Sequence, residues 1–289
     1  MKRARILSVI MILFQCVFAQ SDSTTTSFGT PVFETIDYPG ATATRAYGIN
    51  NSGRIVGSYD SSHGPTTHAF LSYQGEMHVV DPPNSHGWAE AYVINNQGEV
   101  VGSNDYHGKQ AGFLFRSGHY QHIAFVDVSG AEGINEGGLI VGFFGHDFRQ
   151  LHGYLYNPGN QRITRIDYPG ALLTTASAIN DSNVIVGIWV DSSERRHGYV
   201  KDGSAITSMD FPGASETFLA SINSAGDMAG FYDDDAGLRH GFVRSNDQFR
   251  TLDYPGAIST EISCINDVGL IVGDYTDSNG TQHGFVAHL

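Results

Sequence analysis

One short motif recurs six times along this chain, and the repetition constrains the fold more than any other feature of the sequence. The dipeptide Ile-Asn returns at intervals of 45, 40, 45, 43 and 43 residues, and a Gly follows seven residues after each Asn. A period of this size is typical of one supersecondary unit copied in series. A residue that every copy shares is expected to build the copy, so functional residues are expected where the copies differ. The motifs start at Ile49, Ile94, Ile134, Ile179, Ile222 and Ile265.

Each copy contains four short runs of strand-forming residues separated by turn residues. In the fourth copy the runs are 175–180, 184–190, 197–201 and 206–210. Runs rich in Ile, Val, Phe and Tyr that are bounded by Gly, Asn, Asp and Pro predict β-strands and turns. No segment carries a sustained apolar period of ~3.6 residues, so we expect almost no helix.

The segments between the runs have the chemistry of specific turns. An Asn-x-x-Gly sequence, such as 50–53, joins the first run to the second in several copies. The Asn side chain can bond the backbone ahead of it and the Gly accepts positive φ, which predicts a type I turn closed by a G1 bulge. Asn183 takes the place of Gly in the fourth copy, and Asn is the next best residue for that conformation. Asp-Tyr-Pro-Gly, or Asp-Phe-Pro-Gly, ends the fourth run at Asp37, Asp167, Asp210 and Asp253.

Four-stranded antiparallel units of this length, repeated six times, predict an all-β fold: a six-bladed β-propeller around a channel. The N-terminal strand at 32–37 is expected to pair with the strand at 283–287 and so close the ring. An open β-solenoid is the competing fold, although solenoid repeats usually have fewer strands and separate caps. The blades are expected at 41–81, 88–127, 131–167, 171–210, 214–253 and 257–289, the last completed by 31–37.

The first 19 residues have the pattern of a secretory signal peptide. Three cations precede an apolar run at 6–18, and Ala19 suits the position before a cleavage site. The run is shorter than the ~20 residues of a membrane span. We therefore expect 1–19 to be removed, 20–30 to form a linker and 31–289 to be secreted, as an extracellular or periplasmic propeller. A lipoprotein acylated at Cys16 is the alternative, although Gln15 stands where a small residue is expected.

Charge and cysteine content exclude some partners. The formal net charge is −14, and loss of the three N-terminal cations makes it −17. Affinity for nucleic acid depends on Lys and Arg that neutralise phosphates, so no nucleic-acid partner is expected. No second apolar stretch has the length of a membrane span, and we expect a monomer. Cys264 would be the only cysteine of the mature chain, so no intramolecular disulfide can form, and we expect it to be a small buried residue.

A His-containing triplet marks the third run of most copies. It is His-Ala-Phe at 68–70 and His-Gly-aromatic at four further places, whereas 111–113 lacks the His. Together with Tyr-Pro-Gly-Ala, Ile-Asn and Ile-Val-Gly, which copies two and three only partly keep, this pattern resembles the HAF family of bacterial extracellular repeats across 31–289. The resemblance implies an exported, propeller-like repeat protein without an established activity, and it supplies no catalytic residues.

The triplet histidines suggest a transition-metal site at first sight. They recur once per blade, and a ring would spread them around its circumference, whereas a metal needs its ligands within ~2.3 Å of one point. Each His is instead expected to bond a neighbouring turn. These residues are His68, His152, His197, His240 and His283.

Calcium is the one candidate cofactor. The loops between the second and third runs are rich in Asp, Asn and Ser, and Asp and Asn supply the hard oxygen ligands that Ca²⁺ prefers. The alternative is that these residues are simply good turn formers in water. No loop matches the EF-hand pattern. The candidate ligands are Asp233, Asp234, Asp235 and Asp277.

In a propeller these loops share one face with the Asp-Tyr-Pro-Gly loops, and residues of this face that differ between copies are the candidates for ligand binding. Exposed aromatic side chains beside charges are typical of surfaces that bind sugars or proteins. The alternative is that the loops drift in sequence and that both Trp side chains pack between blades. The candidates are His86, Trp88, His107, Phe148, Trp189, Arg195 and Arg196.

These features predict a non-catalytic binding or scaffold module for a polysaccharide or a surface protein. No catalytic residues are assigned, because Gly-x-Ser-x-Gly, HExxH and phosphate-binding loops are absent from the sequence. The first alternative is a carbohydrate-active enzyme, a glycoside hydrolase or lyase at the channel mouth, which would need two carboxylates facing each other in a pocket. The second is a durable spacer at the cell surface.

Overall fold

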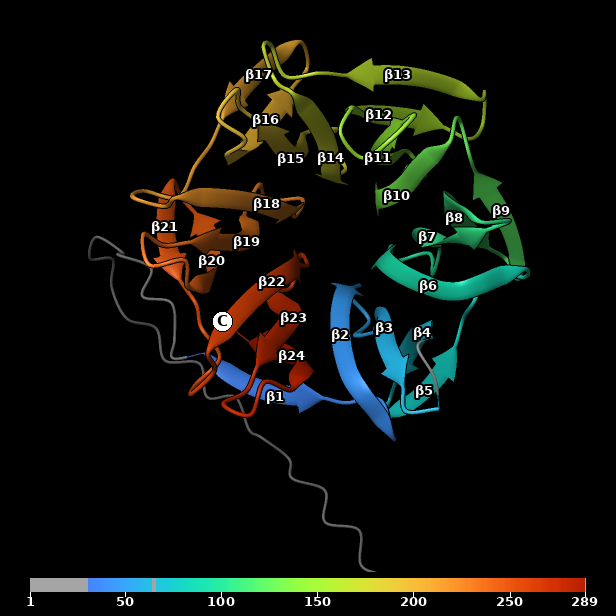
Figure 1. Ribbon diagram of the computed structural model, residues 1–289, viewed down its shortest axis with the longest axis vertical. Helices are drawn as coiled ribbons and strands as arrows, with labels where there is room; N and C mark the ends of the chain where they lie inside the picture. Colours follow the sequence, from blue (N-terminus) through green and yellow to red (C-terminus); the bar gives the residue numbers. More distant parts are fainter. Residues whose placement is uncertain (1–30, 64–65, 289) are drawn as a thin grey trace, which may run out of the picture. The chain divides into compact units, whose positions relative to one another are not determined.

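The computed structural model describes residues 31–63 and 66–288, and they form one compact unit of β-strands. The predicted signal peptide, the linker and Cys16 lie outside the described residues. Within the unit, the sheets stand side by side around a common axis, and the first strand of each repeat is innermost (Figure 1). In this part of the chain no helix is long and apolar enough to cross a membrane. The arrangement is that of an all-β propeller, as predicted.

The fourth repeat shows how each sheet is built. Its strands pair antiparallel in chain order, and every boundary lies within two residues of the predicted one. Ile, Val, Gly and aromatic residues fill the buried positions on both faces of these strands, and Gly, Asn and Asp occupy the turns between them. The strands are β14 (Leu173–Ile179), β15 (Ile185–Val190), β16 (Arg196–Asp202) and β17 (Ala205–Ser208).

Three further sheets have the same four-stranded antiparallel form. The third repeat forms β10 (Val128–Ile134), β11 (Ile140–Gly145), β12 (Leu151–Asn157) and β13 (Arg162–Ile166). The fifth forms β18 (Glu216–Ile222), β19 (Met228–Asp233), β20 (Arg239–Ser245) and β21 (Gln248–Thr251). The sixth forms β22 (Ser259–Ile265), β23 (Leu270–Thr276) and β24 (Gln282–His288), and its fourth strand is β1 (Val32–Ile36).

The first two repeats form one eight-stranded sheet. The first repeat contributes β2 (Ala41–Ile49), β3 (Ile55–Ser61), β4 (Thr67–Tyr73) and β5 (Glu76–Val79). The second contributes β6 (Ser85–Ile94), β7 (Val100–Tyr106), β8 (Lys109–Arg116) and β9 (His119–Ile123).

This sheet corrects the prediction of six separate blades, because the structure shows four separate four-stranded blades. Each half of the eight-stranded sheet repeats the antiparallel order of the other sheets, and one parallel pair, Thr67 with Trp88, joins β4 to β6. The pair lies at the junction where 82–84 reads Pro-Pro-Asn, whereas 38–40, 168–170 and 254–256 read Tyr-Pro-Gly, and it brings the start of β4 against β6.

The first and last strands of the described chain meet in one sheet, as predicted. β1 pairs antiparallel with β24, and Thr35 lies opposite Phe285. The rings of Phe33 and Phe285 have their centres 5.5 Å apart. The sixth repeat thus takes its fourth strand from the other end of the chain, which ties the last repeat to the segment that leads into the first.

The Asn of each Ile-Asn motif builds a turn and joins neighbouring repeats. The Asn50 Oδ1 accepts two backbone N–H groups of its turn, where Gly53 has a φ of 77° and Asn183 at the matching place has 63°, as predicted. The Asn50 Nδ2 donates to the Asn95 backbone oxygen in the next repeat, at 3.1 Å. The bond recurs around the unit and returns from Asn266 to Asn50. We call this closed set the asparagine ring: Asn50, Asn95, Asn135, Asn180, Asn223 and Asn266.

Each inner strand carries a β-bulge, and the repeated Gly of the next strand accommodates it. In the fourth repeat the register shifts between Ala176 and Ala178, beside Gly187. A Cβ atom at Gly187 would lie 2.1 Å from the Thr175 backbone oxygen and 2.8 Å from the ring of Tyr199. Tyr199 is the aromatic residue of the triplet and is fully buried. The Gly is therefore required by the close approach of backbone and core ring.

The triplet histidines bond neighbouring turns, as predicted. The His197 Nδ1 lies 2.9 Å from Asp210 Oδ2, and Asp210 also accepts the backbone N–H of Gly198. The His197 ring stacks on Trp189, which stacks on Tyr168. In the fourth repeat the loop end is thus fixed by a His–Asp hydrogen bond and a column of rings. The corresponding His–Asp bond is made by His68, His152, His240 and His283.

Candidate functional site

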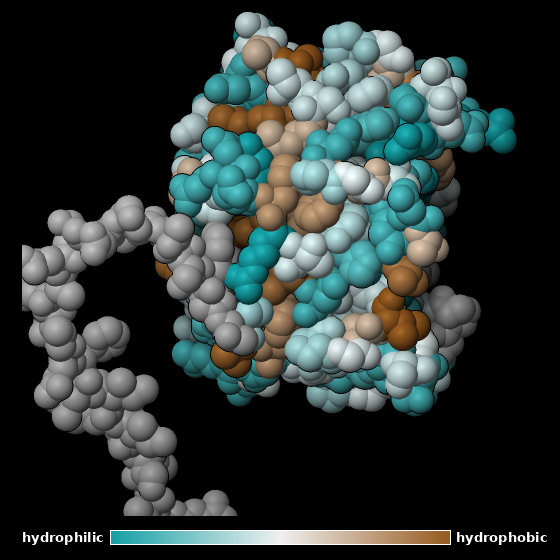
Figure 2. All heavy atoms as spheres, turned by 90° about the vertical axis from the view of Figure 1, so that its left-hand side faces the viewer, coloured by the Kyte–Doolittle hydropathy of each residue, from teal (hydrophilic) through white to brown (hydrophobic). Residues whose placement is uncertain are grey.

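A groove of about 920 Å³ runs from the third repeat over the fourth to Phe218 of the fifth. The β11–β12 loop, the start of β14 and the end of β15 line this groove. Phe148 and Leu172 are 61% and 50% exposed at this groove. Small-molecule sites are typically clefts of ~300–1,000 Å³ lined by apolar and a few polar groups. On the face in Figure 2, by contrast, hydrophobic residues form small groups separated by hydrophilic ones.

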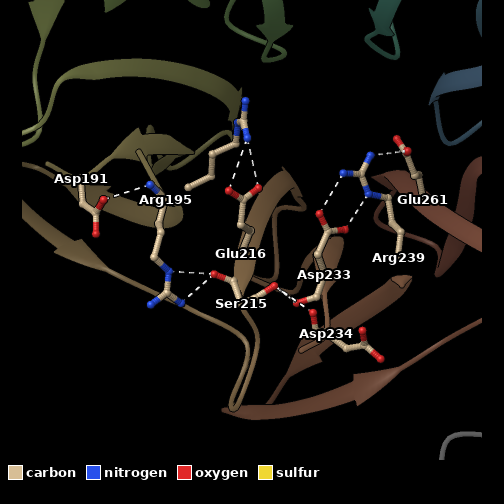
Figure 3. Close-up of polar contacts among 9 residues, drawn as sticks. Asp191, Arg195, Ser215, Glu216, Asp233, Asp234, Arg239 and Glu261 are labelled. Atoms are coloured by element: carbon tan, nitrogen blue, oxygen red, sulfur yellow. Dashed lines mark hydrogen bonds and ion pairs between the residues drawn. The ribbon is translucent and has the colours of Figure 1, made fainter. Parts of the chain in front are cut away.

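An aromatic and arginine cluster forms one wall of the groove. The Arg196 Nη1 lies 3.1 Å from Glu216 Oε2, and its guanidinium carbon lies 5.7 Å from the centre of the Phe218 ring. Phe218 stacks on Phe231 with ring centres 4.4 Å apart. Figure 3 shows Glu216 on the strand beside Ser215, within reach of the basic side chains of the fourth repeat. A ring next to a guanidinium group offers both an apolar face and hydrogen-bond donors to a ligand.

A second guanidinium group lies behind the same rings. The Arg239 Nε is 2.8 Å from Asp233 Oδ1, and its Nη1 is 2.8 Å from Glu261 Oε1 (Figure 3). The hydrogen bond to Asp233 is the largest cause of the raised pKa of Arg239. The hydrogen bond to Glu261 and the charges of both carboxylates raise this pKa further, whereas burial lowers it. Its guanidinium carbon lies 4.7 Å from the centre of the Phe231 ring. The positive charge of Arg239 is therefore already paired.

A channel cavity of about 340 Å³ lies next to the groove, and Ile188 and Phe218 line both. The residue two positions before the Ile of the Ile-Asn motif lines it on every inner strand. The inner strands of a propeller face its channel, so residues far apart in sequence meet there. These residues are Tyr47, Tyr92, Glu132, Ser177, Ala220 and Ser263.

Two carboxylates, Glu90 on β6 and Glu132 on β10, share the channel cavity. The Glu90 carboxylate accepts hydrogen bonds from the hydroxyls of Tyr92, at 2.7 Å, and Tyr47, at 3.4 Å. None of the described residues forms a hydrogen bond or an ion pair with the Glu132 carboxylate. Burial and then the charge of Glu90 raise the pKa of Glu132 to about 7. A carboxyl group that titrates near neutral pH in a cavity marks a candidate functional site.

Three of the predicted ligand-binding residues lie at or beside the groove. Phe148 and Arg196 line it. Arg195 is anchored instead, because its Nη2 donates to the Ser215 backbone oxygen at 2.7 Å, as Figure 3 shows. The groove therefore brings together one predicted aromatic residue and one predicted cation.

The other four predicted ligand-binding residues lie elsewhere. His86 and His107 are neighbours on the second repeat, with ring centres 6.2 Å apart. Trp88 takes part in the pair that joins β4 to β6. Trp189 is held in its column of rings, and its Nε1 donates to Ser208 at 3.1 Å. These residues do not converge with Phe148 and Arg196.

The predicted calcium ligands make bonds within the protein. Asp233 pairs with an arginine. Asp234 and Asp277 each accept two backbone N–H groups of their own loop on Oδ1, and these bonds lower the pKa of both carboxyl groups. Asp235 is exposed. Within 31–63 and 66–288, no three His, Cys, Asp or Glu side chains are grouped so as to hold a metal ion.

The six channel residues two positions before the Ile of Ile-Asn are absent from the sequence candidates, because those candidates were chosen among loops. Aligning the copies on Ile-Asn shows the signal, since the residue two positions before Ile reads Tyr, Tyr, Glu, Ser, Ala and Ser. Only the third copy places an acid there, Glu132. Phe218 had no comparable signal, because strands carry many such residues, and Leu172 directly precedes such a strand.

Comparison with protein-family models and with curated proteins found no match. Solved structures do match. TolB from Acinetobacter baumannii has a TM-score of 0.58 at 10% identity over 82% of this chain and 64% of that chain, so this chain spans less than two thirds of that protein. The SapL1 lectin in complex with alpha methyl fucoside has a TM-score of 0.56 at 9% identity, over 81% of this chain and 88% of that one. The β-propeller domain of the Trilobed protease from Pyrococcus furiosus, with an open velcro topology, has 0.54 at 9% identity, over 84% and 95%.

At these identities the likenesses show the fold alone. The fold is an all-β propeller with four-stranded antiparallel blades, and in this chain β1 completes the last of them.

Proposed function

We propose that this protein is an exported binding module whose groove takes a polysaccharide. The observation that carries the proposal is the groove of about 920 Å³, with exposed Phe148 and Leu172 at its rim and Arg196 in its wall. Apolar side chains suit the faces of sugar rings, and an arginine donates to their hydroxyls. The likeness to a lectin that binds a fucoside supports the proposal.

A surface protein is the other partner that the sequence suggests. Stable protein–protein interfaces bury ~1,600 Å² in total, whereas the apolar groups here line a concave site. A glycan chain fits such a site better than a flat protein surface does. The surface protein becomes the preferred partner if no glycan binds.

The proposal includes the finer architecture and the export of the chain. The two halves of the eight-stranded sheet act as two blades, so that six units surround the channel, and the six members of the asparagine ring support this. Residues 1–19 direct export, and the chain acts as a monomer of the HAF type. Mass spectrometry of protein from the culture medium tests export, and retention of residues 1–19 would contradict it.

A glycan array with the purified chain tests the binding function. We expect a bound polysaccharide fragment, and we expect Leu172→Ala to weaken its binding about tenfold, because a buried apolar contact of ~1.4 kcal/mol is lost. The matched control is Ile258→Ala, since Ile258 follows the same Pro-Gly-Ala turn, is 56% exposed and lies outside the groove. Equal losses for both variants, or no bound glycan at all, would reject the groove as the site.

Carbohydrate hydrolysis is the second candidate function. The observation in its favour is that Glu90 and Glu132 share one cavity and that the pKa of Glu132 is raised to about 7. A glycosidase needs such a protonated acid and a second carboxylate. Incubation with glycans followed by product analysis tests it: cleavage that Glu132→Gln abolishes would establish the enzyme.

Calcium is retained only as a proposal for Asp233, Asp234, Asp235 and Asp277. An ion there would have to replace the backbone bonds of Asp234 and Asp277. Thermal melting with and without EDTA tests it, and a lower midpoint with EDTA would show that calcium stabilises these loops.

A further inference from the structure

The channel cavity holds two carboxylates without a counter-charge. Its lining contains Glu90 and Glu132, and no Lys or Arg of the described chain lines it. Arg239 lies over the Phe231 ring but is bound by Asp233 and Glu261. Both residues are only partly buried, and the charge of Glu90 disfavours ionisation of Glu132. A proton or a cationic ligand would relieve this repulsion.

The two carboxylates differ in what they have left to offer. Glu90 already accepts the hydroxyls of Tyr92 and Tyr47. Glu132 has no hydrogen-bond partner among the described side chains and backbone groups, and it faces the cavity. One carboxylate is thus fixed in place, and the other is free to accept hydrogen bonds from a ligand.

The walls of the cavity favour an ammonium group over a metal ion. The rings of Tyr47 and Tyr92 meet edge to face, 5.4 Å between centres, beside the two carboxylates. Carboxylates next to aromatic rings are the surroundings that stabilise organic cations. Ca²⁺ takes six to eight oxygen ligands, and the described chain offers no group of three acidic or His side chains for it.

The cavity is next to the groove, because Ile188 and Phe218 line both. We propose that the polysaccharide of the groove carries unacetylated amino sugars, and that the protonated amine of one unit binds between Glu90 and Glu132 in the channel cavity. This inference rests on the proposed function and names the class of its ligand. The formal net charge of −14 suits a polycationic glycan.

Proton linkage separates this inference from hydrolysis. The charged and titratable groups that face Glu132 are Glu90 and Tyr92 from β6, Tyr154 from β12 and, beside Glu90, Tyr47 from β2. An ammonium group bound there favours the ionised form of Glu132, so at pH 6 binding releases a proton. A general acid must hold this proton until it protonates the leaving group, so hydrolysis requires protonated Glu132, whereas ammonium binding requires ionised Glu132.

The experiment is isothermal titration of the full chain at pH 6 with a tetramer of β-linked glucosamine and with its N-acetylated counterpart. We expect the free-amine tetramer to bind about tenfold more tightly, which is ~1.4 kcal/mol. We also expect its binding to release about one proton, measured by comparing the heat of binding in buffers of different ionisation heat. Glu132→Gln should remove the preference and the proton release. Glu76→Gln removes an exposed carboxylate outside the channel cavity and should keep both.

The outcomes distinguish the inference from the function on which it rests. Equal binding of both tetramers would overturn the inference and leave the binding function standing. Binding of neither tetramer overturns the inference, and a blank glycan array would then remove the binding function too. A preference that survives in Glu132→Gln, or cleavage of the tetramer, also overturns it.

Discussion

In the asparagine ring all six repeats carry the same residue, whereas three residues earlier, on the inner strands, they carry different residues. Asn180 makes the same bond to the next repeat as every other Asn of the ring. Ser177, on the same strand, faces the channel cavity, where its counterparts include Tyr47, Glu132 and Ala220. A contact between neighbouring repeats must be the same at every junction, so it fixes the residue. The channel position, in contrast, carries a different set of residues from repeat to repeat.

The largest expected effect comes from breaking the ring at Asn180→Ala. The Nδ2 bond to the Asn223 backbone oxygen is lost, and so are two Oδ1 bonds from the N–H groups of Ser182 and Val184. We expect the free energy of unfolding in urea to fall by about 3 kcal/mol, because buried polar groups lose their partners.

The matched control is Asn183→Gly. Asn183 has a φ of 63°, and other repeats carry Gly there, so we expect a cost within about 1 kcal/mol for its one lost bond from Asn135. If the Asn180 and Asn183 variants were equally stable, the ring would not be the feature that holds the repeats together.

A smaller effect, of opposite sign, is expected in the channel from Glu132→Gln. The folded pKa of Glu132 is about 7 and its ordinary value is 4.5, so the folded state binds the proton more tightly. The wild type therefore loses stability as pH rises from about 4.5 to 7, and the Gln variant does not. We expect the variant to be more stable by on the order of 2 kcal/mol at pH 8 and equal at pH 4. A variant less stable than wild type at pH 8 would contradict an uncompensated charge in the channel.

The smallest effect is expected from Ser177→Ala. Its side chain lines the channel cavity, and the fifth repeat already has Ala220 at this position. We expect the free energy of unfolding to change by less than about 0.5 kcal/mol, which thermal melting checks as a small shift of the midpoint. A larger loss of unfolding free energy, measured by chemical denaturation, would contradict this expectation. It would show that stability constrains the channel position as well as the asparagine ring.

Much of the fold could be predicted from local sequence. The run at 184–190 predicts β15, and Asn183 predicts the positive φ that its turn adopts. That His197 bonds a neighbouring turn was also expected, because the His recurs with the repeat, and the structure identifies Asp210 as its partner. The prediction of six separate blades was wrong, since the Thr67–Trp88 pair depends on how far β6 extends toward its neighbour.

The candidate site was predicted only in part. Phe148 and Arg196 were expected on the loops and do line one groove. Trp189 looked equally suitable, but its ring is held between Tyr168 and His197. An aromatic residue in a sequence does not reveal whether its faces are covered, because the covering rings come from other strands.

The sequence by itself determined the period, the strands, the turns and the residues that join one repeat to the next, because each of these depends on chemistry repeated within a short stretch of chain. Only the tertiary structure decided that Glu90 and Glu132 share a cavity without a cation, and that Phe218 lies between this cavity and the groove. The physical reason is that the channel gathers single side chains from separate repeats, and their charges and burial arise only when all the inner strands surround the axis.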